Sequence, residues 1–139
     1  MKELVSALLV WISLQFAAEP PVPPDIRFVS RQELAERLYG GDAPADAPVT
    51  AVYNRETGTV YLAKGWRIDS LRDRSILLHE LVHHTQQRCA LPYPCLAARE
   101  RDAYEMQADW LRQHGESDPY AVIGVDEFTV RLTSMCRPS

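Results

Sequence analysis

The chain of 139 residues has few lysines and no run of basic residues. Lys2 and Lys64 are the lysines among its 15 basic residues, and 19 acidic residues bring the formal net charge to −4. Proteins that bind nucleic acid usually carry a strongly basic face. The composition therefore disfavours nucleic acid as a partner.

Long apolar runs are also missing. A membrane-spanning helix needs about 20 apolar residues, and the apolar stretch 4–16 is shorter than that. A short apolar stretch near the N-terminus is typical of a secretory signal. We predict a signal peptide over 1–18, cleaved after Ala17 or Ala18, and an exported protein, either periplasmic or secreted. Two alternatives stay open, namely an uncleaved N-terminal anchor, the one case in which we expect membrane contact, and a helix buried in the fold.

Cysteine is scarce, with Cys89, Cys95 and Cys136 as the complete set. In an exported protein these residues would form one disulfide and leave one free thiol. Three pairings are possible, and the short separation favours Cys89–Cys95. All three stay reduced if the protein is not exported. Their spacing matches no cysteine-type zinc site.

The chain does contain enough apolar material for a core. Hydrophobic residues make up 46% of it and charged residues 24%, which excludes wholesale disorder. A chain of 139 residues corresponds to one domain that can bury its own core. We expect a proline-rich linker over 19–29 and a single domain over 30–139.

Capping, strand-forming and turn residues predict an α+β domain. Ser30 and Ser70 each begin a capping box, which marks a helix N-terminus, and two β-branched and aromatic runs around 54–58 predict a β-hairpin. The predicted strands are 49–53 and 59–62, joined to the first helix by a Pro/Ala/Asp loop over 42–48. The predicted helices are 31–39 (closed by Gly40 and Gly41), 71–88, 96–114, a short one after Asp118, and 126–135. The sheet is therefore expected to be small and antiparallel.

His79, Glu80 and His83 form a His-Glu-x-x-His motif in the middle of a predicted helix. Four residues advance an α-helix by about 6 Å and turn it by about 400°, so the two imidazoles lie nearly above each other and can share one metal ion. Glu80 lies about 100° round the helix from His79, where its carboxylate can take a proton from a metal-bound water. The alternative is a pair of core or surface histidines without an ion.

A catalytic zinc site needs a third protein ligand and leaves a fourth position to water. We expect Glu105, on the next predicted helix, to be that ligand. Asp109 shares its face and is expected to hydrogen-bond the distal nitrogen of one histidine, which would raise the basicity of that ligand. The alternative for both is a solvated acidic face, because the same helix also carries Glu100 and Asp102.

The His-Glu-x-x-His motif, followed about twenty residues later by Glu-x-x-Ala-Asp at 105–109, resembles the pattern of the gluzincin zinc metallopeptidases. The pattern is most like that of the membrane-linked and periplasmic members, and similar motif pairs occur in small minimal-gluzincin domains. The likeness covers 49–114. It implies a zincin-like fold in which a hairpin packs on an active-site helix and a ligand helix follows. It also implies one zinc ion held by the two motif histidines and Glu105, Glu80 as general base, and Asp109 as the residue that orients a ligand.

The resemblance further implies that the strand before the active-site helix, Thr59–Ala63, borders the cleft and pairs with an extended peptide or protein substrate. Larger gluzincins also have a second lobe and a separate group that stabilises the oxyanion. This chain is too short for a second lobe, and no motif identifies the oxyanion group. Residues of suitable chemistry are His84, Tyr104, His114 and Tyr120.

The function predicted from these features is zinc-dependent hydrolysis of peptide bonds by a small exported metallopeptidase. One alternative is a non-catalytic zinc-binding domain, or a degenerate peptidase, with a structural or interaction role. The intact Glu80 argues against it, because a purely structural ion needs no acid at that position. Another alternative is a metal-free module whose helices dock a partner.

Overall fold

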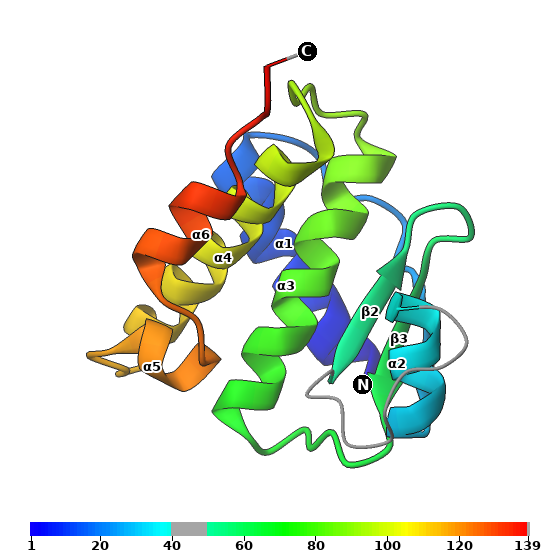
Figure 1. The fold of residues 1–139 in the computed structure, drawn as a ribbon. Helices are drawn as coiled ribbons and strands as arrows, with labels where there is room; N and C mark the ends of the chain where they lie inside the picture. Colours follow the sequence, from blue (N-terminus) through cyan, green and yellow to red (C-terminus); the bar gives the residue numbers. More distant parts are fainter. Residues whose placement is uncertain (40–49, 139) are drawn as a thin grey trace.

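The computed structural model describes residues 1–39 and 50–138. The elements, in chain order, are α1 (Lys2–Phe16), β1 (Asp25–Val29), α2 (Arg31–Tyr39), β2 (Ala51–Asn54), β3 (Thr59–Ala63), α3 (Leu71–Arg88), α4 (Leu96–Gln113), α5 (Pro119–Ile123) and α6 (Glu127–Thr133). In Figure 1, α3 lies in the middle, with the sheet and α2 on one side and α4, α5 and α6 on the other. The predicted α+β class is confirmed. The glycine pair, the loop and the strand residue predicted within 40–49 lie outside the described residues.

The local signals around α3 act as the sequence indicates. The Ser70 hydroxyl accepts a hydrogen bond from the Asp73 backbone N–H at 3.1 Å and so satisfies one of the free donors at the helix N-terminus. Further along, Leu77, Leu78 and Leu81 have no exposed surface. Each such side chain contributes about 1.5–3 kcal/mol through burial. The helix that carries the motif is therefore fixed from several sides.

The predicted hairpin is present, and its turn is built by Asn54. The side-chain oxygen of Asn54 accepts hydrogen bonds from the backbone N–H groups of Glu56 and Thr57 at 2.9 and 3.1 Å. Gly58 follows with φ of +69°, a conformation that glycine adopts without steric cost. β2 and β3 pair antiparallel as a result.

The sheet has a third strand that the sequence interpretation placed in a linker. Residues 25–29 form β1, which pairs parallel to β3 with Ile26 opposite Val60. The proline-rich extended segment thus ends at Pro24, and the β-formers that follow it complete a mixed sheet in the order β1-β3-β2. The predicted antiparallel pair is therefore confirmed, but the sheet as a whole is mixed, because a parallel strand joins it from a distant part of the chain.

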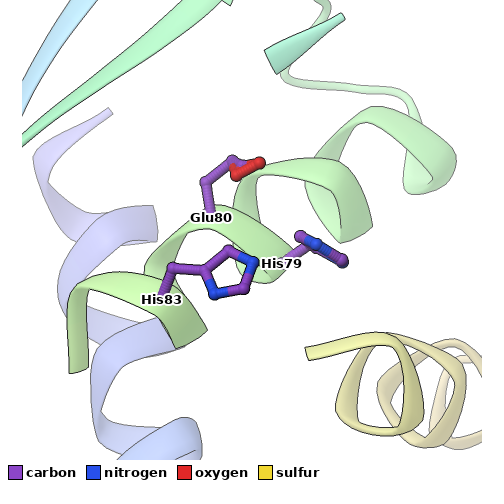
Figure 2. A group of neighbouring side chains, drawn as sticks. All are labelled: His79, Glu80 and His83. Carbon is purple, nitrogen blue, oxygen red and sulfur yellow. The ribbon is translucent and has the colours of Figure 1, made fainter. Parts of the chain in front are cut away.

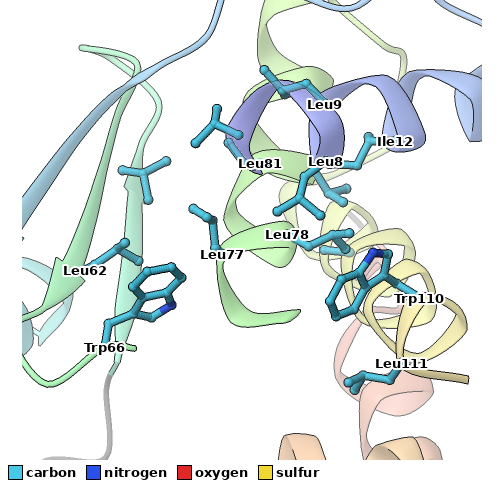
Figure 3. Packing of buried hydrophobic residues seen from close by; sticks show 14 residues of the cluster. Leu8, Leu9, Ile12, Leu62, Trp66, Leu77, Leu78, Leu81, Trp110 and Leu111 are labelled. Carbon is cyan, nitrogen blue, oxygen red and sulfur yellow. The ribbon is translucent and has the colours of Figure 1, made fainter. Parts of the chain in front are cut away.

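The N-terminal apolar segment is a helix packed in the core of the full chain. Leu8, Leu9 and Ile12 of α1 are 3%, 2% and 0% exposed and belong to the same apolar cluster as Leu77 and Leu78 of α3 (Figure 3). This is the buried-helix arrangement among the alternatives left open by the sequence. Within the described residues, no helix combines the length and apolar character needed to cross a membrane. Cleavage and export stay predictions.

The disulfide differs from the favoured pairing. Cys95 is bonded to Cys136, and Cys89 is a free thiol. α6 packs on α4, so the C-terminal tail passes beside the N-terminus of α4, where Cys95 lies. Proximity along the chain was the only basis for Cys89–Cys95, and the tertiary path of the tail overrides it.

Candidate metal centre

The motif residues lie together on α3. Ligand atoms of His79, Glu80 and His83 all lie within 4.8 Å of one another, and the group could hold a metal ion (Figure 2). The two imidazole rings meet edge to face with centroids 5.0 Å apart. The predicted stacking of two histidines one helical turn apart is confirmed.

The third group that reaches the histidines is Glu100 of α4. Its Oε2 lies 3.4 Å from Nε2 of His79, and its Oε1 contacts Nε2 of His83. One carboxylate therefore contacts the Nε2 atoms of both imidazoles. α4 brings it there because α3 and α4 are the most extensively packed pair of helices among the described elements.

Glu105 and Asp109, predicted as ligand and supporting residue, lie elsewhere. Glu105 pairs with Arg101 at 3.0 Å, and Asp109 pairs with Arg112 at 2.9 Å. With about 100° of turn per residue, Glu105 lies about 140° and Asp109 about 180° round α4 from Glu100. The prediction for both residues is wrong, because only the face of α4 that carries Glu100 meets α3.

The sequence held a signal for the correct glutamate. The Glu-x-x-Ala pattern occurs twice in α4, at 100–103 and at 105–108, and the two copies differ by five residues. Ala103, Trp110 and Leu111 are all buried and share the helix face of Glu100. The apolar periodicity thus indicates that the glutamate of the first copy faces α3. The second copy fits the Glu-x-x-Ala-Asp pattern only because Asp109 follows it.

Two buried glutamines that the sequence interpretation missed hold the histidines from behind. Nδ1 of His79 lies 2.9 Å from Oε1 of Gln107, and Nδ1 of His83 lies 2.9 Å from Oε1 of Gln86. Gln107 is seven residues after Glu100, so both lie on the same face of α4. Gln107 therefore makes the hydrogen bond to a histidine that we expected from Asp109.

The electrostatics of the centre reflect its crowded carboxylates. Burial alone would lower the pKa of His83, but the hydrogen bond to Glu100 and the charges of Glu80 and Glu100 raise it to about 9. For Glu100, burial raises the pKa, yet the hydrogen bonds and charges of His79 and His83 bring it well below its usual range. The place between these groups therefore favours positive charge.

Glu80 is the unpaired member of the group. Its side chain is buried, and its Oε2 has no hydrogen-bond partner among the described residues. Burial raises the pKa of this carboxyl, an effect that the neighbouring His79 and His83 oppose. A buried acceptor without a partner costs about 1–3 kcal/mol, so its presence calls for an explanation by function.

A cavity of about 530 Å³ adjoins the centre and is walled by α3, α4 and β2, including Ala51, Val52 and Tyr53. β2 is an edge strand, because the sheet order is β1-β3-β2. The prediction that Thr59–Ala63 pairs with substrate is wrong, since β3 is central and both its edges are taken. The outer edge of β2 pairs with no strand within 1–39 and 50–138.

Of the four residues considered for the oxyanion, Tyr104 lines this cavity. Its ring packs edge-on to His79 with centroids 4.5 Å apart. Burial and the charges of Glu100 and Glu80 raise the pKa of Tyr104 to about 12, so its hydroxyl stays protonated.

The other three residues do not line the cavity. His84 is hydrogen-bonded to the Tyr53 hydroxyl and to the Val22 carbonyl, and His114 donates a hydrogen bond to the Trp110 carbonyl. Tyr120 lies on α5, on the far side of α4 from the sheet (Figure 1). Tyr104 is therefore the residue of this set that a bound molecule could contact.

The full chain, residues 1–139, matches the model of a family described as "Domain of unknown function (DUF6647)", and the chain belongs to that family. The matched residues include α1 as well as the metal centre. No curated protein and no solved structure matches the chain.

Proposed function

We propose that this protein is a zinc-dependent hydrolase that cleaves peptide bonds. The observation that carries the proposal is the meeting of both Nε2 atoms of His79 and His83 with one carboxylate, Glu100, at the wall of an open cavity. A second carboxylate, Glu80, is buried beside them, and one of its oxygens has no hydrogen-bond partner in the described part of the chain. The His-Glu-x-x-His half of the gluzincin pattern agrees with this assignment, whereas Glu105 and Asp109 of its second half pair with arginines instead.

The donor set suits zinc. Two imidazole nitrogens and one carboxylate oxygen are a common ligand set of catalytic zinc sites. His79 and His83 come from α3 and Glu100 from α4, so the packing of two helices assembles the set. The Nε2 atoms face oxygens of Glu100, so a cation bound there would take the place of the proton that Glu100 stabilises on His83.

The residues have distinct roles in the proposed reaction. Zinc, when bound, would polarise the scissile carbonyl and lower the pKa of a coordinated water towards 7. Glu80 accepts a proton from the attacking water and delivers it to the leaving amine, and burial tunes its pKa upward for that exchange. His79, His83 and Glu100 hold the ion and transfer no proton.

The cavity supports catalysis over a purely structural ion. Structural zinc sites are usually closed by four protein ligands, whereas catalytic sites keep a position for water. Here three residues converge on one place and about 530 Å³ of open space adjoins it. The outer edge of β2, which pairs with no strand among the residues that the structure describes, could bind an extended peptide or protein segment through backbone hydrogen bonds.

We also propose that the protein acts outside the cytosol. Disulfides persist in oxidising compartments and are rare in the cytosol. The Cys95–Cys136 bond supports this placement, and export was predicted from the N-terminal segment. This segment packs in the core of the full chain as α1. An exported protein that retains α1 would therefore retain the complete core.

Metal analysis combined with an assay of peptide hydrolysis tests the proposal. The purified wild type should bind one zinc ion and cleave an unstructured protein substrate. Glu80→Gln should keep the zinc and lose at least about 100-fold in rate, whereas His83→Ala should lose both. Glu105→Gln, a matched change on the outer face of α4, should behave as wild type. A wild type without zinc, or an active Glu80→Gln, would overturn the proposal.

A further inference from the structure

Both imidazoles of the centre are held on the side that faces away from Glu100. The Nε2 atoms face the carboxylate, and the Nδ1 atoms face amide oxygens of Gln86 and Gln107. The two glutamines are 0% and 2% exposed. Which nitrogen of each histidine carries hydrogen depends on how these amides are oriented.

Gln86 can be oriented from its other contacts. Its Nε2 donates to the backbone carbonyl of Arg99 at 3.0 Å and to the Tyr93 hydroxyl at 3.1 Å. A carbonyl oxygen only accepts, so the amide nitrogen must point there and Oε1 must point to His83. Nδ1 of His83 is therefore the donor of that hydrogen bond.

Gln107 is oriented by the same reasoning. The hydroxyl of Ser75 donates its single hydrogen to the Arg72 carbonyl at 2.6 Å. The Ser75 oxygen therefore accepts from Nε2 of Gln107, 3.1 Å away. Oε1 of Gln107 is left for His79, whose Nδ1 must donate.

We infer that Gln86 and Gln107 are positioning residues that commit both histidines to bind metal through Nε2 while adding no charge to the centre. The inference rests on the proposed metal site. A carboxylate in the same position would also accept from Nδ1, and it would raise the basicity of the ligand. Neutral amides fix the same tautomer and leave Glu80 and Glu100 as the carboxylates next to the histidines. The site binds zinc less tightly than a carboxylate-backed one and keeps the ion more electrophilic.

Methionine and glutamate substitutions separate these effects. Gln107→Met and Gln86→Met keep the approximate volume but remove the acceptor, and each should weaken zinc binding by about 10- to 100-fold. Gln107→Glu keeps the acceptor and adds charge, so it should bind zinc at least as tightly as wild type. Gln32→Met, on the exposed face of α2, is the matched control. Circular dichroism establishes whether each variant is folded. If a methionine variant does not fold, Gln107→Glu still tests the inference.

Heteronuclear NMR of the histidine side chains provides a readout that does not depend on hydrolysis. In the zinc-loaded wild type, both motif histidines should show coordinated Nε2 and protonated Nδ1, and Gln107→Glu should retain that signature where Gln107→Met loses it for His79. Coordination through Nδ1 in the wild type, or methionine variants that bind zinc as Gln32→Met does, would overturn the inference. If the wild type binds no zinc, the proposed function fails. The metal-free protein at high pH then still tests the inference, because the hydrogen bonds to Gln107 and Gln86 should place the ring hydrogen of each histidine on Nδ1.

Discussion

Raising the pH from 7 to 9 should strengthen zinc binding by about 50-fold, because zinc and a proton compete for Nε2 of His83. The pKa of this imidazole is raised to about 9, since its contacts with Glu100 and Glu80 outweigh the effect of burial. Each pH unit below that value reduces the neutral form, which binds metal, by about tenfold. Above pH 9 the affinity should level off.

The stability of the metal-free protein should change in the opposite direction. The pKa of His83 is 6.5 without perturbation and about 9 in the folded chain. The stabilisation by its proton is therefore fully present below pH 6.5 and is lost as the pH rises through 9. This difference between the two pKa values corresponds to about 3 kcal/mol of stability. The contact between His83 and Glu100 is counted once in that figure, through His83 alone. His83→Ala should remove this pH dependence.

Competition with a chelator of known affinity, at constant ionic strength from pH 6 to 10, measures the first effect, and chemical unfolding after chelation measures the second. Calorimetry in two buffers of different ionisation enthalpy should show about one proton released per zinc at pH 7. An affinity that does not change between pH 7 and 9, or zinc binding without proton release, would refute the reasoning.

Three further predictions concern ligands and architecture. Glu100→Gln should weaken zinc binding by more than about 100-fold, since a direct ligand matters more than its supporting residues, whereas equal loss in Glu105→Gln in the same titration would contradict the assignment. Deleting 1–18 should cost at least about 6 kcal/mol, because four buried apolar side chains of α1 leave the core, and a truncated protein that melts like the full chain would disprove that. Cys136→Ser should lower the free energy of unfolding in denaturant by about 4 kcal/mol, because a loop with a sequence separation of 41 is opened. Cys89→Ser, which removes the free thiol, should leave it unchanged, and equal effects would count against the bond.

Local chemistry explains what could be predicted about α3 and the hairpin. The capping of α3 by Ser70 and the turn at Asn54 each depend on residues within a few positions. The approach of His79 and His83 depends only on the helical repeat. Interactions of this range are fixed wherever the segment folds, so the pattern of residues is sufficient to find them.

Choices between distant segments could not be read in the same way. α4 offers two glutamates in the same motif, and only the packing of α4 on α3 selects Glu100 over Glu105. The partner of Cys95 depends on where the tail returns, which a spacing rule does not contain. Gln86 and Gln107 carry no motif signal, since a glutamine becomes a positioning group only when it is buried beside a histidine.

The sequence by itself determined the two histidines that could hold a metal ion, the acid beside them, and the helix and hairpin that frame them, because these follow from the geometry of a single turn of chain. Only the tertiary structure decided which carboxylate faces the pair, which strand of the described sheet lies at the cavity, and whether the N-terminal apolar segment packs inside. Those outcomes depend on which surfaces meet when α1, α3 and α4 pack together, and burial of apolar area, which drives that packing, is not directional.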